Sequence, residues 1–111
     1  MGVVTLAAGT YLLTAPYQMT EGAKLTFDGT GATGPVIIKP ASTKAFVTSP
    51  GSALTVATTL TLKGLTIEGN GYNNDDGGQI YFNGGVFYAD RVTFKDGDSD
   101  GTGGCVFLKD T

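Results

Sequence analysis

The chain has 111 residues, 18 of them glycine, with 15% charged residues and a net charge of −3. This length fits one domain over 1–111, and a composition rich in glycine, threonine and β-branched residues indicates an all-β fold. The charge is uneven, because residues 1–67 carry +2 and residues 68–111 carry −5. The acidic second half argues against binding nucleic acid or an anionic membrane, and it suits either divalent cations or solvated turns.

No run of residues is apolar enough to span a bilayer, and the amino-terminal residues lack the basic and continuous apolar segments of a signal peptide. The chain has one cysteine, Cys105, and no histidine. It therefore forms no internal disulfide, and its compartment cannot be inferred from cysteine usage. Strand-like sequence begins within three residues of Met1, so we expect a trimmed chain or an internal piece of a longer one.

Residues 1–59 predict short strands separated by turns. The alternating or apolar segments are closed by Gly, Pro, Ser or Asn, and they lie at 3–6, 11–13, 24–28, 36–38, 45–48 and 53–57. Residues 14–22 contain Pro16 and are predicted to form a loop. No segment has the pattern of a helix of meaningful length.

Residues 60–70 contain the clearest strand pattern. Leu60 and Leu62 alternate with polar residues before Gly64, and Leu65 and Ile67 do so after it. Successive side chains on a strand point to opposite faces, so these four residues are predicted to face the core. The glycine between the two halves predicts a bend at which the strand turns a corner.

The pattern recurs with nearly constant spacing. The tripeptide at 65–67 returns at 92–94, an offset of 27 residues (92 − 65 = 27), and the segment 77–80 returns at 103–106, an offset of 26 (103 − 77 = 26). Short strands repeating at this period favour a solenoid over an antiparallel sandwich, in which tight Asn-Gly or Asp-Gly hairpins are typical. We expect a right-handed parallel β-helix of about four coils, with irregular entry coils over 1–59 and repeat coils over 60–111.

The repeat resembles a known family. Residues 67–70 followed by 77–80 are similar to the paired motifs of polymorphic outer membrane protein repeats, and the second copy, 94–97 with 103–106, departs from them at Gly97 and Cys105. Residues 6–11 and 62–67 resemble coils of pectin-lyase-like right-handed β-helices. The resemblance implies an extracellular or cell-surface protein with an adhesive role, although its motifs specify coils rather than chemistry.

The acidic turns carry the sharpest chemical signal. Asp96, Asp98 and Asp100 alternate and are followed by Gly101, as at the start of a calcium loop, in which hard oxygen ligands surround the cation. The twelfth position of such a loop needs a bidentate acid but holds Phe107 here. The two interpretations are a Ca²⁺ site and a solvated acidic turn. The turn at 73–76 is oxygen-rich but lacks the alternate spacing.

Catalysis would have to rest on carboxylates and one arginine. Adjacent residues on a strand point apart, so Asp75 and Asp76 do not form the facing acid pair of a glycosidase. Pectin-degrading β-helix hydrolases, by the same resemblance, use a His-Gly and an Arg-x-Lys element, whereas this chain has no histidine and continues Arg91 with Val92 and Thr93. A lyase with Arg91 as base beside bound calcium is the remaining enzymatic hypothesis. We expect no catalytic residues.

Aromatic residues cluster around the acidic turns. If Ile80 and Phe82 point inward, Tyr81 points outward, and a lateral sugar-binding strip is a hypothesis at Tyr72, Tyr81 and Tyr88. Threonines also recur at outward strand positions, as in ice-binding solenoids. The strand propensity of threonine explains them more simply.

Both ends of the predicted solenoid are expected to present open strand edges, which invite pairing with another chain. At the carboxyl-terminal end we predict an assembly edge at Val106 and Leu108. The expected function is a non-catalytic module that stacks on itself, on flanking coils or on a partner protein. The alternatives are an adhesin face that binds surface glycan and a β-helix fragment of a polysaccharide lyase or hydrolase.

Overall fold

The computed structural model describes residues 2–14, 17–40, 46–48, 54–69, 80–95 and 106–109. The elements of this part of the chain are all β-strands: β1 (Gly2–Thr5), β2 (Gly9–Leu13), β3 (Tyr17–Met19), β4 (Lys24–Asp28), β5 (Val36–Pro40), β6 (Phe46–Thr48), β7 (Leu54–Glu68), β8 (Ile80–Lys95) and β9 (Val106–Lys109). Each pairing between them is parallel. The chain is therefore all-β, as its composition predicts.

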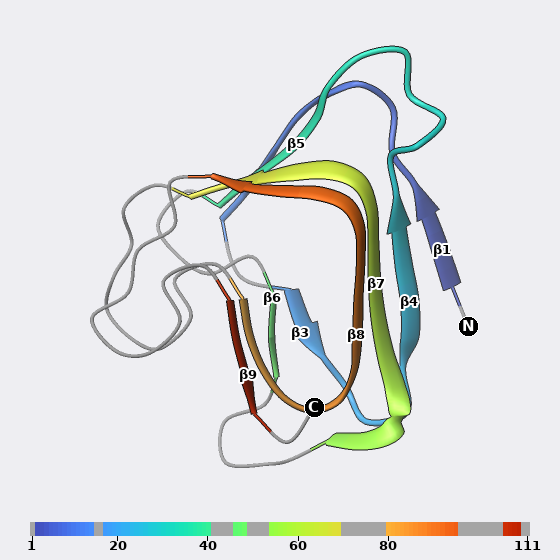
Figure 1. The fold of residues 1–111 in the computed structure, drawn as a ribbon, viewed down its shortest axis with the longest axis vertical. Coiled ribbons are helices and arrows are strands. Elements are labelled where there is room, and N and C mark those ends of the chain that lie inside the picture. The colour runs from blue at the N-terminus through green and yellow to red at the C-terminus, as the bar shows by residue number, and fades with distance from the viewer. Residues whose placement is uncertain are drawn as a thin grey trace.

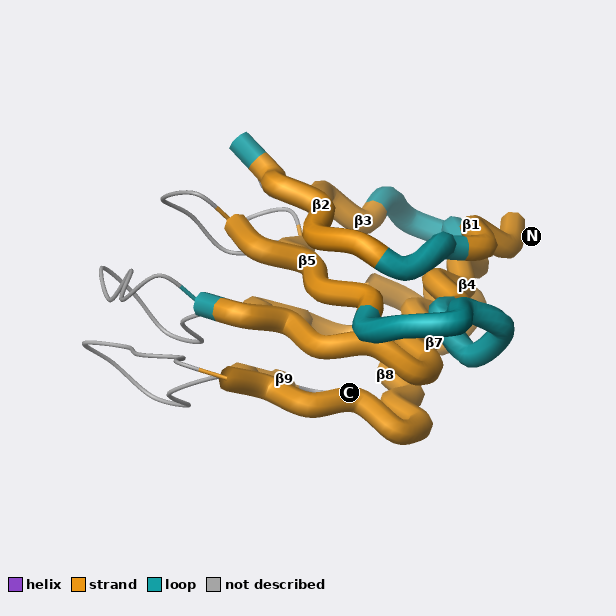
Figure 2. Tube along the Cα trace, turned by 90° about the horizontal axis from the view of Figure 1, so that it is seen from above, coloured by secondary structure: helices purple, strands orange, loops and turns teal. Residues whose placement is uncertain are grey.

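The strands form a parallel sheet that curls around three sides of a central core (Figure 1). The first side consists of β1, β4, residues 59–63 of β7 and residues 86–90 of β8, side by side in that order. The second consists of β2, β5 and the later parts of β7 and β8. The third consists of β3, β6, residues 80–83 of β8, and β9. Each side thus stacks four strands, and from above the strands lie in layers, with β2 and β3 at one end and β9 at the other (Figure 2).

The sequence repeat corresponds to the register of the stack. Leu65 pairs with Val92 and Ile67 with Phe94, which is the 27-residue offset read from the sequence. Ile80 pairs with Val106 at the 26-residue offset. The predicted stacking of the repeats is therefore confirmed at these positions, because residues that recur in the sequence lie side by side on neighbouring strands.

The predicted corner at Gly64 is also confirmed. β7 continues through this residue, which has a φ of 60° in the left-handed region where glycine is favoured. A Cβ atom at this position would lie 2.8 Å from Thr30 Cγ2 and 3.0 Å from the Thr30 backbone nitrogen. The bend therefore needs glycine both for its backbone conformation and for its close packing against the 29–35 loop.

The core fills the inside of the curl. The four residues predicted to face it, Leu60, Leu62, Leu65 and Ile67, are at most 4% exposed. The buried apolar residues come from four strands in all: Met19 of β3, Val36 and Ile38 of β5, Ile80 and Phe82 of β8, together with the four of β7. The inward-facing residues of β7 thus lie between neighbouring strands on both sides along the axis of the stack.

One local prediction is wrong. Residues 14–22 were expected to form a loop, but they contain β3, which pairs with β6 from Tyr17 to Met19. Met19 is fully buried, whereas Tyr17 and Gln18 are exposed. A single buried residue gives no periodic pattern of burial, and tertiary pairing rather than local sequence determines this strand.

Candidate functional site

The first layer of the stack, made of β1, β2 and β3, forms a sheet edge that we call the N-terminal end face. These three strands contain no Asp, Glu, Lys or Arg. Val3 is 61% exposed, Leu12 64% and Tyr17 43%. Unpaired edges in natural sheets are usually guarded by charges, prolines or bulges. An uncharged edge with exposed apolar side chains is instead suited to being covered.

The N-terminal end face contains an apolar hollow of about 150 Å³. Its walls come from first-layer residues Leu6, Tyr11, Leu13 and Tyr17, and its remaining lining is Phe27 and Ile38 of the next layer. The Tyr17 ring meets the Phe27 ring edge-on, with centroids 5.8 Å apart. The Tyr11 hydroxyl donates a hydrogen bond to the Ala7 carbonyl at 2.7 Å, which directs its polar end away to the backbone. A hollow with this lining can accept an apolar or aromatic side chain.

The opposite edge, residues 86–95 of β8 together with β9, is called the C-terminal end face. Phe87 and Phe94 face the core but are only partly buried, although their neighbours in the preceding layer, Leu60 and Ile67, are fully buried. On β9, Val106 is also partly buried and Leu108 is 47% exposed. We call residues that are paired in register from layer to layer a column. Burial decreases toward the last layer along each inward-facing column, so the core is open at this end.

Exposure of large apolar side chains is confined to these two faces in the part of the chain that the structure describes. The exposed set is Val3, Val4, Leu12 and Tyr17 on the first face, with Tyr88 and Leu108 on the second. Described side chains of β4, β5 and β7 contribute none. In this part of the chain, a large apolar side chain is therefore exposed only where its strand lies in the first or the last layer of the stack.

A second candidate lies at the corner between the first and second sides. Arg91 has a φ of 54° and is the one non-glycine residue at positive φ among the described residues. It follows Asp90, which pairs with Lys63, and so it occupies in β8 the corner position that Gly64 occupies in β7. Left-handed backbone at a side chain of this size costs about 1–2 kcal/mol. Strained residues of this kind are a reason to look for a function nearby.

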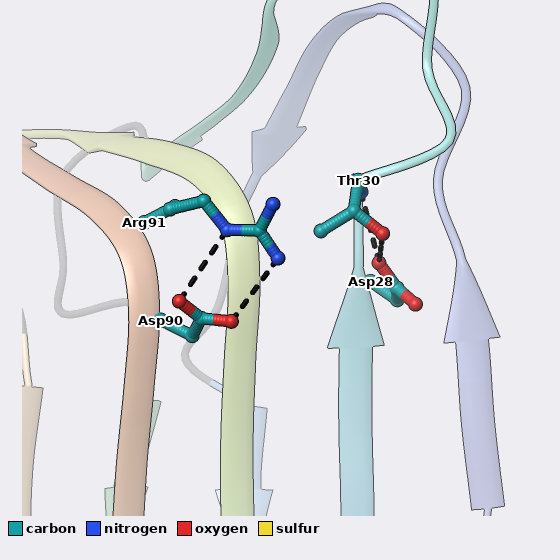
Figure 3. Close-up of polar contacts among 4 residues, drawn as sticks. All are labelled: Asp28, Thr30, Asp90 and Arg91. Atoms are coloured by element: carbon teal, nitrogen blue, oxygen red, sulfur yellow. Dashed lines mark hydrogen bonds and ion pairs between the residues drawn. The ribbon is translucent and has the colours of Figure 1, made fainter.

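The charges at this corner alternate from layer to layer. Asp28, Lys63 and Asp90 lie in register on β4, β7 and β8. Arg91 Nε and Nη2 donate to the Asp90 carboxylate at 3.3 and 3.1 Å, whereas Asp28 accepts from the Thr30 hydroxyl and amide at 2.5 and 2.8 Å (Figure 3). These Thr30 hydrogen bonds, with smaller contributions from the charges of Lys63 and Arg91, hold the pKa of Asp28 below its usual value of 3.8.

A second alternating column lies on the second side. Lys39 Nζ is 3.3 Å from Glu68 Oε2, and Glu68 lies opposite Lys95 in register. Like charges are thus kept apart by one layer in both columns. Such pairs contribute little stability singly, but they disfavour a shift of one strand along its neighbour.

A shallow polar groove of about 280 Å³ lies beside the corner. Gly34 and Pro35 of the 29–35 loop form one wall, and Gly64, Thr66, Arg91 and Thr93 are among its other lining residues. Its threonine hydroxyls and exposed guanidinium can donate hydrogen bonds. No carboxyl is among these lining residues, and Asp28 at the same corner has a lowered pKa that makes it a poor general acid.

The structure places some of the sequence-predicted site residues and not others. Ile80 and Phe82 are fully buried and Tyr81 between them is partly exposed, as strand alternation predicts. Tyr81 precedes and Tyr88 follows the turn at Gly84 and Gly85, whose φ values are 78° and 73°, so the two tyrosines lie on different sides of the curled sheet. The remaining residues of these predictions, Tyr72 of the sugar-binding strip and Asp96, Asp98 and Asp100 of the calcium site, lie outside the described residues.

Among the described residues, no group of three or more His, Cys, Asp or Glu side chains is placed to hold a metal ion. In the same residues, the structure contains no helix with the length and apolar character needed to cross a membrane.

The sequence predicts an open edge at the amino-terminal end, but it did not reveal the apolar hollow and uncharged strands of the N-terminal end face, nor the strain at Arg91. The absence of charge from β1, β2 and β3 is visible in the sequence, but it has meaning only once these strands are known to share one edge. The conformation of Arg91 could have been found from the repeat, because the 27-residue offset aligns it with the predicted corner at Gly64.

Comparisons with protein-family models, with curated proteins and with solved structures gave no match.

Proposed function

We propose that this chain is a right-handed parallel β-helix of about four coils that serves as a non-catalytic structural module and assembles through the end faces of its stack. Parallel pairing of four strands on each of three sides supports the coil. The strong preference of parallel crossover connections for a right hand supports its handedness. An extracellular or cell-surface location, implied by the repeat resemblance alone, belongs to the same proposal.

One observation carries the proposal: exposed large apolar side chains occur on the two end faces and not on the described side chains between them. Burying a Val or Leu side chain contributes about 1.5–3 kcal/mol, so a few such contacts per face are comparable with the cost of bringing two molecules together. Backbone groups of the edge strands would add hydrogen bonds to the same contact. The expected assembly is therefore concentration-dependent.

The test is to place a charge on the C-terminal end face. Leu108→Lys and, separately, Val106→Lys are expected to lower the mass of the assemblies measured by sedimentation velocity, since a buried lysine at the contact would lack a partner. Leu108 is half exposed, so its substitution should leave the fold intact, which the melting temperature checks. The matched control is Thr61→Lys, which adds the same charge on β7 in the middle of the stack.

Other outcomes would replace the proposal. If Leu108→Lys leaves assembly unchanged, the end face is not the contact. If the chain binds glycans and loses that binding in Tyr81→Ala, the lateral adhesin hypothesis is favoured. Turnover of an acidic polysaccharide that Arg91→Ala abolishes would contradict a non-catalytic role.

Calcium binding at Asp96, Asp98 and Asp100 stays a separate prediction. A ligand that binds only the folded chain must stabilise it. A melting temperature that rises with added Ca²⁺ in the unmodified chain, but not in Asp98→Asn, would support the site.

A further inference from the structure

We infer that the partner at the end faces is a second copy of this chain, bound head to tail, with its N-terminal end face continuing the strand register of the C-terminal end face. This inference rests on the proposed function and adds the identity of the partner, the polarity and the register. The strand register between neighbouring layers within one copy is extended by one layer to give the contact between two copies.

The register follows from the columns of the stack. Val3, Thr26, Thr61 and Tyr88 lie in one outward-facing column across four layers. Continuing that column by one layer places Tyr88 of one copy against Val3 of the next. These residues are 58% and 61% exposed in the single chain, so the contact covers both.

The inward-facing columns continue in the same way. Tyr11, Ile38, Ile67 and Phe94 form one column, so Phe94 of one copy would lie against Tyr11 of the next. Tyr11 lines the apolar hollow of the N-terminal end face, and Phe94 is a partly buried aromatic at the opposite end. On the third side the register places Val106 against the exposed Tyr17, and Leu108 against Met19, which is already fully buried in the single chain.

The charges are compatible with this arrangement. Asp90 and Lys95 end the two alternating charge columns, which begin at Thr5 and Leu12. Continued by one layer, the register places Asp90 against Thr5 of the next copy and Lys95 against its Leu12. The N-terminal end-face strands carry no charge, so no like charges meet across the contact. Two C-terminal end faces brought together would instead join partly buried aromatics to one another and leave each hollow unfilled.

Head-to-tail contacts use two different surfaces of each copy and do not close unless the copies rotate into a ring. The shape of the stack therefore favours an open, linear assembly. Each copy would add four layers to a continuous parallel sheet on each side.

Cysteine crosslinking between copies tests the register. Neighbouring strands lie about 4.7–4.9 Å apart, within the Cα separation that a disulfide accepts. Two single variants, Val3→Cys and Tyr88→Cys, each in a Cys105→Ser background, are mixed and oxidised. We expect a covalent dimer in the mixture and much less in either variant alone. The matched control replaces Tyr88→Cys with Thr61→Cys, which lies in the same column in the middle of the stack and should give no dimer with Val3→Cys.

The outcomes separate the inference from the function on which it rests. A dimer formed by Tyr88→Cys alone would overturn the head-to-tail polarity while leaving assembly through the end faces intact. Assembly that Leu108→Lys abolishes, without crosslinking in the mixture, would overturn the register. A chain that stays monomeric and forms no crosslink would overturn both.

Discussion

At the scale of single residues, β7 and β8 turn the same corner between the first and second sides with different residues. β7 turns at Gly64, against which Thr30 packs so closely that no side chain fits. β8 turns at Arg91 with nearly the same backbone angle, and its side chain is free to extend outward to Asp90. The repeat predicts a corner at both positions, whereas the glycine alone predicts the conformation at only one.

The strain at Arg91 can be measured by comparing two substitutions. Arg91→Gly removes the left-handed strain but also the exposed pair with Asp90, which is worth about 0–1 kcal/mol, so its free energy of unfolding should stay close to that of the unmodified chain. Arg91→Ala loses the pair and keeps the strain, so it should be about 1 kcal/mol less stable than Arg91→Gly. Urea unfolding of both variants checks this order, and equal stabilities would contradict the strained conformation.

The Asp28–Thr30 contact predicts a pH dependence. A carboxyl with a lowered pKa in the folded state contributes stability that is fully present above its unfolded value, here 3.8, and is lost as pH falls through the folded pKa. Thr30→Val removes the hydroxyl donor and should move the pKa of Asp28 upward, toward 3.8. NMR titration of the Asp28 carboxyl carbon in both chains measures the shift. An unchanged titration would show that the hydroxyl is not the main cause.

At the scale of elements, the layer in which a strand lies decides the role of its apolar residues. Ile67 and Phe94 are neighbours in one column, yet Ile67 is fully buried on β7 and Phe94 is partly exposed at the end of β8. Strand alternation in the sequence predicts that both face inward. It does not reveal which layers are covered, because cover depends on the neighbours along the stack.

A pair of truncations tests this dependence. Ile67→Ala should cost about 2–5 kcal/mol of unfolding free energy, the usual range for emptying a buried aliphatic site. Phe94→Ala in dilute protein should cost less despite removing a larger side chain, since part of that ring already meets water. Denaturant unfolding at low protein concentration provides the comparison. An equal or greater cost for Phe94→Ala would show that this end is already covered within one chain.

Strands differ in how far the sequence alone reveals them. The repeat offsets correctly paired residues 65–67 with 92–94 and Ile80 with Val106, because parallel strands that stack in register turn a sequence period into spatial neighbours. β3 could not be predicted, since only Met19 of its three residues is buried and the strand exists through its pairing with β6. Strands with both a pattern and a repeat are visible in the sequence, and strands defined only by a neighbour are not.

At the scale of the whole molecule, the candidate site is a property of the stack and not of a motif. Open edges at both ends follow from a solenoid pattern in the sequence, and Val106 and Leu108 were predicted from it. The residues of the N-terminal end face were not, because its hollow is assembled from β2, β3, β4 and β5 and from Leu6. The alternating charge columns likewise become visible only when the layers are aligned.

The most direct test of assembly through the end faces is the mass of the unmodified chain, measured by light scattering over a wide range of concentrations. Assembly through both end faces predicts a mass that rises steadily with concentration and passes beyond the dimer, since each added copy presents a new open face. A mass equal to that of a single chain at every concentration would contradict it.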